Sequence, residues 1–221
     1  MYIELKDLSK SIRGTTVLQN INLRFEQGRI YGLKGPNGCG KTMLMRTICG
    51  LIRPTEGTVD INGEVLWSKI SFPRSIGILI ENPAFLPQYT GLKNLQMLAN
   101  LQNKVDTQQL RETLTAVGLE PDDPRKYRKY SLGMKQRLGV AAAVAERPDI
   151  ILLDEPINAL DEKGVQLIKA LLLRERERGA IIIIACHDKE ELEFLSNEII
   201  EIEEGKIKGQ YVLEKDGDQD E

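Results

Sequence analysis

A glycine-rich segment, residues 35–42, carries the residue types best suited to chemistry. Its sequence, GPNGCGKT, fits the pattern GxxxxGK followed by Ser or Thr, and it lies between an apolar strand pattern and an amphipathic helical one. Glycines let backbone N–H groups converge on phosphate oxygens, and the start of the helix adds positive potential. Lys41 would reach the terminal phosphates, and the hydroxyl of Thr42 would bind Mg²⁺. The predicted nucleotide contacts here are Gly35, Pro36, Asn37, Gly38, Cys39, Gly40, Lys41 and Thr42.

Two carboxylates follow a second apolar run. The run 150–153 reads IILL and is followed directly by Asp154 and Glu155. Open α/β sheets bind ligands at the carboxyl ends of their strands. Because neighbouring strand residues point to opposite faces, one of these two carboxylates can join the Mg²⁺ ligands while the other polarises a water molecule. The alternative is a plain strand end with solvated acids.

Two further candidate sites lie on either side of this strand in the sequence. Ser131 and Gly133 precede an Ala-rich helical pattern, where a serine N-cap and a glycine allow an anion to approach the helix N-terminus. Simple helix capping is the alternative there. His187, the only histidine, directly follows the apolar run 180–186, where it could reach a γ-phosphate. A surface or capping role is its alternative.

The elements that must position these residues fall into three parts. Strand patterns dominate up to about residue 84, three helical patterns without an intervening strand occupy about 85–146, and strand–helix alternation returns over 147–213. Alternation with continuous Ile and Leu strands predicts a mainly parallel sheet covered on both faces. We therefore expect one domain over 1–221, with its core in 1–84 and 147–213. Residues 85–146 are then an inserted helical subdomain and 214–221 a polar acidic tail. The expected strands are 3–8, 17–25, 29–33, 76–80, 150–153, 180–185, 199–202 and 207–212. One helix is expected directly after the glycine-rich segment, and the others at 92–101, 107–117, 137–145, 162–178 and 189–195.

Composition narrows the class of protein. The formal charge of −3 argues against a protein that mainly coats nucleic acid, so no nucleic-acid partner is expected. No apolar run approaches the roughly 18 residues that span a bilayer. The first residues show no secretory signal pattern, and the three cysteines have no metal-type spacing. These features predict a cytosolic chain with free thiols.

The order of the motifs resembles the ATP-binding subunit of ABC transporters over about residues 2–212. In that family GPNGCGKT is the Walker A loop, ILLDEP the Walker B strand, NALD the D-loop and His187 the switch histidine. The sequence YSLGMKQRL looks like the signature motif of drug and bacitracin-type exporters, and the segment IENPAF at 80–85 is similar to that subfamily. The resemblance implies an ABC-type P-loop NTPase fold of the α/β class. Such a fold has an N-terminal antiparallel β part, a mainly parallel core and a helical insertion.

Family resemblance also implies a mechanism. Each chain has one Walker A loop and one signature motif, so two ATP-binding subunits, identical or different, would form a head-to-tail dimer. ATP and Mg²⁺ bound by Lys41 and Thr42 of one subunit would then be covered by Ser131 and Gly133 of the other. Asp154 would bind Mg²⁺, and Glu155 would orient the attacking water. His187 would contact the γ-phosphate, and Asp161 would connect the two ATP sites of the dimer.

Five positions depart from the family pattern. In the signature motif, Leu132 and Met134 replace a glycine and a glutamine. Glu81 stands where a glutamine is usual, and its carboxylate is still a hard oxygen ligand for Mg²⁺. Ile12 replaces the aromatic residue expected on adenine, and Met43 lacks a hydroxyl that commonly supports the α-phosphate.

The sequence therefore predicts an ATPase that drives transport, most consistently export, through separate membrane-spanning subunits. We expect it on the cytoplasmic face of the cell membrane as a peripheral subunit. Two alternatives stay open at this point. One is a soluble ABC-type ATPase without a transporter, and the other is a nucleotide-binding regulatory module with weak hydrolysis, motivated by the altered signature and by Glu81.

Overall fold

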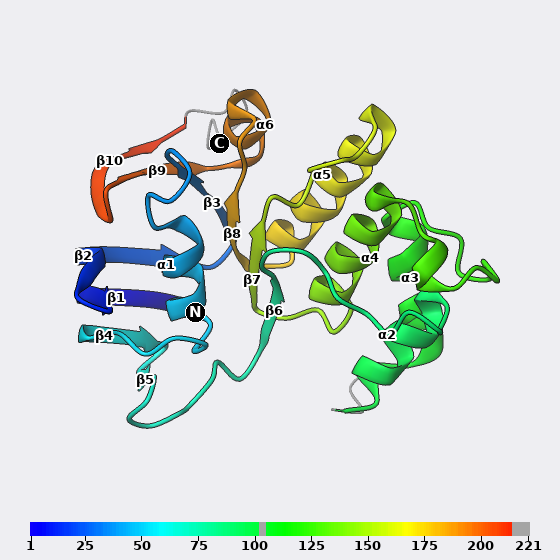
Figure 1. Cartoon of the computed structure of the whole chain (residues 1–221), viewed down its shortest axis with the longest axis horizontal. Helices are drawn as coiled ribbons and strands as arrows, with labels where there is room; N and C mark the ends of the chain where they lie inside the picture. Colours follow the sequence, from blue (N-terminus) through cyan, green and yellow to red (C-terminus); the bar gives the residue numbers. More distant parts are fainter. Residues whose placement is uncertain (102–104, 214–221) are drawn as a thin grey trace, which may run out of the picture. The chain divides into compact units, whose positions relative to one another are not determined.

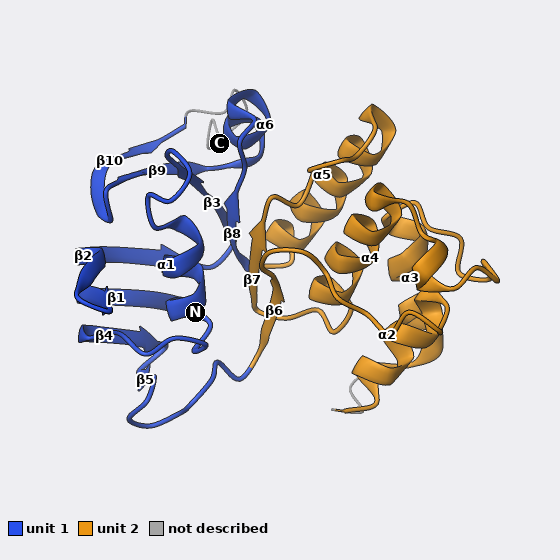
Figure 2. Ribbon diagram, viewed as in Figure 1, with its two compact units in different colours: residues 1–74, 181–221 blue, residues 75–180 orange. Residues whose placement is uncertain are grey.

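The computed structural model describes residues 1–101 and 105–213 (Figure 1). The polar acidic tail predicted at 214–221 lies outside the described residues. The chain divides into two compact units (Figure 2). Unit 1 comprises residues 1–74 and 181–221, and unit 2 comprises residues 75–180.

The N-terminal part of unit 1 is an antiparallel sheet with the strand order β2-β1-β4-β5. Along β2, Ile21, Leu23 and Phe25 are buried while the residues between them are exposed, which is the period of a strand with one covered face. This sheet is the antiparallel part that the family resemblance implies. Its strands are β1 (Tyr2–Ile12), β2 (Thr15–Glu26), β4 (Glu56–Ile61) and β5 (Glu64–Val65).

The other strands of unit 1 follow the order β10-β9-β3-β8. β3 pairs in parallel with both β8 and β9, and β10 pairs antiparallel with β9. Every residue of β8 is buried, as in parallel strands covered on both faces. A Cβ built on Gly32 of β3 would lie 2.5 Å from the Ser196 hydroxyl, so glycine is what lets the segment after α6 approach this strand. The elements are β3 (Arg29–Lys34), α1 (Lys41–Ile48), β8 (Ile181–Ala185), α6 (Lys189–Leu195), β9 (Glu198–Glu203) and β10 (Lys206–Val212).

Unit 2 combines a parallel strand pair with a group of helices. β6 pairs with β7, and α4 packs on both strands. A Cβ built on Gly77 would lie 1.6 Å from the carbonyl oxygen of Ala143, so α4 and β6 are in direct backbone contact. The elements are β6 (Ile76–Leu79), α2 (Gly91–Ala99), α3 (Thr107–Ala116), the 3₁₀ helix η1 (Tyr127–Lys129), α4 (Leu132–Val144), β7 (Ile150–Asp154) and α5 (Glu162–Glu177).

The helical patterns predicted between residues 85 and 146 form α2, α3 and α4. Contacts group these helices with β6, β7 and α5, so the unit boundaries differ from the predicted subdomain boundaries. Division of the chain into a core and an inserted subdomain stays a prediction. α4 begins at Leu132 rather than near residue 137, because Ser131 caps it.

Within the described ranges, none of the helices combines the length and the apolar character that crossing a membrane requires.

Candidate functional site: a phosphate-type loop and the turn after β7

The glycine-rich loop connects β3 to α1 in unit 1. Lys41 begins α1, is only 7% exposed, and folds back into the loop, where its Nζ donates to the carbonyl oxygens of Gly35 at 2.7 Å and Pro36 at 3.0 Å. The N–H of Gly205, in the turn between β9 and β10, donates to the Cys39 carbonyl oxygen at 2.9 Å. The loop therefore holds the lysine ammonium, and a hydrogen bond from the turn between β9 and β10 holds the loop.

Two glycines of the loop leave little or no room for a side chain. Gly35 has φ +153°, and a Cβ there would lie 2.1 Å from the carbonyl oxygen of Ile202. Gly40 has φ +117°, and its Cβ would lie 3.0 Å from the carbonyl oxygen of Val17. At Gly35 the approach of the β9 backbone excludes a side chain, whereas at Gly40 the contact with β2 is tight and the backbone conformation itself favours glycine.

The start of α1 fits an anionic group. No side chain caps this helix, and its first turn holds no acidic residue. The first N–H groups of a helix have no partner within the helix and carry partial positive charge. With the Lys41 ammonium beside them, these groups suit a phosphate, and Thr42 in the same turn adds a hydroxyl oxygen. Buried Cys39 fills the inside of the loop, with its Sγ 3.8 Å from the lysine Nζ.

A charged cluster precedes the loop, and the sequence reasoning missed it. Lys34, the last residue of β3, donates through Nζ to Glu201 Oε1 at 2.8 Å and to the Tyr211 hydroxyl at 3.2 Å. These two hydrogen bonds raise the pKa of Lys34, and the lysine in turn lowers the pKa of Glu201. The cluster joins the end of β3 to β9 and β10 directly before Gly35. One signal was present in the sequence, a lysine at the end of an apolar strand.

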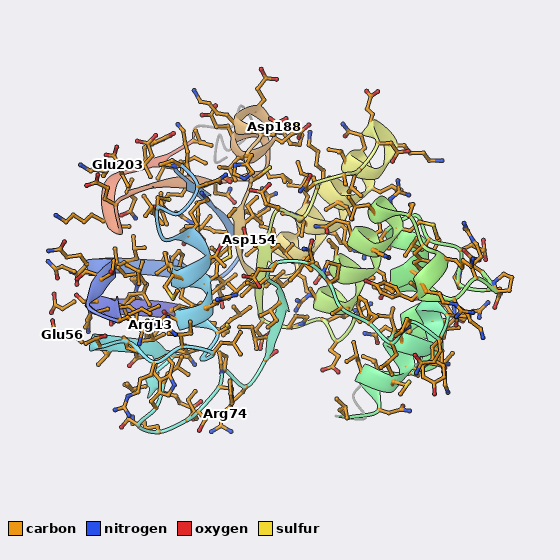
Figure 3. All side chains as sticks on the ribbon, viewed as in Figure 1. Arg13, Glu56, Arg74, Asp154, Asp188 and Glu203 are labelled. Carbon is orange, nitrogen blue, oxygen red and sulfur yellow. The ribbon has the colours of Figure 1, made fainter. Side chains whose placement is uncertain are left out.

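In unit 2, the predicted carboxylates stand at the end of β7. Asp154 is the last residue of the strand (Figure 3), Glu155 is the first residue after it, and both are half-buried. Glu155 has φ +54°, a left-handed conformation that is uncommon outside glycine. The turn then runs to Asp161, whose side chain accepts from the Gly164 N–H at 3.1 Å and caps α5.

The predicted anion site at the start of α4 also has its N-cap. The exposed Ser131 accepts from the Met134 N–H at 3.2 Å, and Leu132 is 65% exposed. Gly133 faces the turn after β7, because a Cβ there would lie 2.8 Å from the carbonyl oxygen of Ala159. The helix cap is confirmed, and contact of Ser131 with a nucleotide stays a prediction.

The remaining candidates lie on loops. His187 is exposed two residues beyond β8, and the next residue, Asp188, caps α6 by accepting from the Glu191 N–H at 3.1 Å (Figure 3). Glu81 is exposed two residues beyond β6, in unit 2, with φ +64°. Ile12 ends β1 and is 38% exposed, next to Arg13 at the hairpin tip (Figure 3).

Of the predicted metal ligands, Thr42 belongs to unit 1, and Asp154 and Glu81 belong to unit 2. Across residues 1–101 and 105–213 there is no cluster of three or more His, Cys, Asp or Glu side chains of the kind that holds a metal ion.

Comparison with known proteins places this fold and these motifs in one family. The ABC transporter family model matches residues 18–158. The chain is 49% identical over 205 residues to the uncharacterized ABC transporter ATP-binding protein YybJ of Bacillus subtilis, covering 93% of this chain and 94% of that relative. It is 40% identical to the bacitracin transport ATP-binding protein BcrA of Enterococcus faecalis, over 93% of this chain and 67% of that one.

A solved structure has the same fold as this chain. The dimeric post-hydrolysis state of the ATP-binding cassette MJ0796, bound to ADP and Pi, matches with a TM-score of 0.84 and 26% identity, covering 96% of this chain and 99% of the other. The chain therefore belongs to the ABC transporter family and has the fold of its ATP-binding cassettes.

Proposed function

We propose that this chain is the ATP-hydrolysing subunit of an exporter and that it works as a head-to-tail dimer on separate membrane-spanning subunits. The observation that carries the nucleotide-binding part of the proposal is the uncapped start of α1 with Lys41 bound inside the loop before it. This arrangement is suited to a phosphate chain, which is where ATP and all other nucleoside triphosphates concentrate their charge.

Family membership makes the chain an ATP-binding subunit with ATPase chemistry. The names of its relatives refer to transport, which favours this function over the soluble ABC-type ATPase that the sequence left open. One of those names specifies bacitracin transport, and it supports the assignment of the chain to an export system.

The proposed roles in phosphate binding follow from the chemistry of each side chain. Lys41 moves from the carbonyl oxygens of Gly35 and Pro36 to the terminal phosphates, while backbone N–H groups of the loop and of α1 bind the remaining phosphate oxygens. Thr42 and Asp154 supply hard oxygen ligands, with Glu81 as a further candidate. Bound Mg²⁺ would supply positive charge that offsets the charge on the transferring phosphoryl group.

For hydrolysis, Glu155 accepts a proton from the attacking water and orients it. His187 contacts the γ-phosphate, and Ser131 and Gly133 of the second subunit cover it. Ile12 and Met43 replace residues with stronger nucleotide contacts, so the phosphates contribute most of the binding energy. An apolar contact of Ile12 with the base remains part of this proposal.

Affinity purification from detergent-solubilised membranes tests the transport role. We expect the tagged full chain to co-purify with a polypeptide that has several hydrophobic spans, because the proposed subunit acts through such a partner. The same purification with a Glu155→Gln chain and ATP should retain that partner. Repeated recovery of the chain from the soluble fraction alone, with no membrane polypeptide attached, would contradict the transport role and leave the ATPase role standing.

A further inference from the structure

One face of α4 contacts the turn after β7 at three places. Gly133, Gln136 and Arg137 are spaced at i, i+3 and i+4 and therefore lie on the same side of the helix. Gly133 lies against the carbonyl oxygen of Ala159, and Arg137 forms an ion pair with Asp161. The helix thus follows the whole turn from its start to the cap of α5.

Gln136 makes the contact at the start of this turn. Its Nε2 donates to the backbone carbonyl oxygen of Glu155 at 2.6 Å, and the residue is only 8% exposed. A carbonyl oxygen can only accept, so the amide nitrogen of the glutamine must face it. A buried hydrogen bond of this kind fixes both the donor and the peptide group that it reaches.

The peptide group concerned belongs to a residue with an unusual backbone. Glu155 has φ +54°, and non-glycine residues keep such a conformation only where the surrounding structure determines it. Gln136 holds the carbonyl of this residue directly, whereas Gly133 and Arg137 hold later parts of the turn. The direction of the Glu155 side chain depends on this backbone conformation, because the Cα–Cβ bond turns with it.

We propose that Gln136 is a positioning residue for Glu155 and that it connects this carboxylate to Ser131 through α4. The inference rests on the proposed function, in which Glu155 activates water in one composite site and Ser131 covers the nucleotide of the other. Ser131 caps the helix five residues before Gln136, so the cap and the hydrogen-bond donor that holds Glu155 belong to the same helix.

Gln136→Met tests this role, because methionine has a similar length and no amide donor. A misplacement of about 1 Å in a catalytic site can lower turnover about 100-fold, so we expect kcat for ATP hydrolysis to fall about 10- to 100-fold. The KM for ATP and the affinity measured by calorimetry should not change, since Gln136 is not among the proposed phosphate contacts.

Gln109→Met is the matched control. Gln109 also donates through Nε2 to a backbone carbonyl, that of Ala145 at the end of α4, at 2.8 Å. Its removal costs the same kind of hydrogen bond in the same unit without touching the turn after β7, so kcat should stay at the wild-type value. Equal kcat values for Gln136→Met and Gln109→Met would overturn the proposal.

A double variant separates positioning from general loss of structure. If Gln136 acts through Glu155, adding Gln136→Met to Glu155→Gln should lower the residual turnover no further. If the losses of turnover from the two substitutions multiply in the double variant, Gln136 acts independently of the carboxylate. That result would overturn the proposal for Gln136 and leave the proposed role of Glu155 standing. A Glu155→Gln chain with the wild-type rate would overturn both this inference and the proposed role of Glu155.

Discussion

Replacing Glu155 by glutamine is expected to lower ATP turnover about 100-fold or more and to leave ATP binding intact. General-base catalysis contributes roughly 10²- to 10⁴-fold to such reactions, and an amide cannot accept the proton from water as a carboxylate does. The side chain keeps its size, and the Gln136 hydrogen bond reaches the main chain of residue 155, so the turn is preserved. Steady-state turnover and calorimetric ATP affinity, measured on the same preparation, check both parts of the result.

Two other glutamates serve as references for this experiment. Glu162 lies in the first turn of α5 and has no proposed contact with nucleotide, so Glu162→Gln should hydrolyse ATP at the wild-type rate. Glu81→Gln restores the glutamine that the family usually has and should also remain active. If Glu155→Gln keeps the wild-type rate while Glu81→Gln loses it, the role of general base belongs to Glu81.

Lys41→Ala is expected to weaken ATP binding about 10- to 100-fold. A hydrogen bond to a charged group contributes about 1.5–3 kcal/mol, and each 1.4 kcal/mol changes a dissociation constant tenfold. In the loop, Lys41 is the residue that carries the positive charge, and its ammonium is held among backbone carbonyls that a bound phosphate would replace. Calorimetric titration with Mg-ATP measures the change.

Lys69→Ala is the matched control for this substitution. Lys69 also donates through Nζ to a loop carbonyl, that of Gly63 at 2.8 Å, in the same unit but away from the residues around Gly35. Its removal should leave the affinity for ATP unchanged. An unchanged affinity for the Lys41→Ala chain as well would contradict the assignment of residues 35–42 as the phosphate-binding loop.

The site was predictable wherever its function depends on a short, local pattern. The glycine-rich loop, the carboxylates after β7 and the caps at Ser131 and Asp161 each follow from neighbouring residues, because the chemistry of a cap or a phosphate loop is local. Element boundaries were less predictable. β1 continues to Ile12 past Leu8, and register shifts after Leu5 and again after Leu8 interrupt its alternation.

The features that sequence reasoning missed depend on contacts between distant segments. β4 buries only two of its six residues fully, and β5 is two residues long, so neither shows the period of a strand. Lys34 is 167 residues from its partner Glu201, and the pairing exists only because β3 and β9 lie side by side. Gln136 reads as an ordinary helical residue, and only the fold brings it to the Glu155 carbonyl.

The measurement that tests the central claim most directly is sedimentation of the Glu155→Gln chain with nucleotide. The proposed dimer binds ATP between Lys41 of one subunit and Ser131 of the other, so a chain that binds ATP without hydrolysing it should accumulate as a dimer. We predict a dimer with Mg-ATP, a monomer with ADP, and a monomer with Mg-ATP after Ser131→Arg is added. A Glu155→Gln chain that binds ATP yet sediments as a monomer at saturating Mg-ATP would contradict the head-to-tail mechanism, as would a dimer that persists in the Ser131→Arg variant.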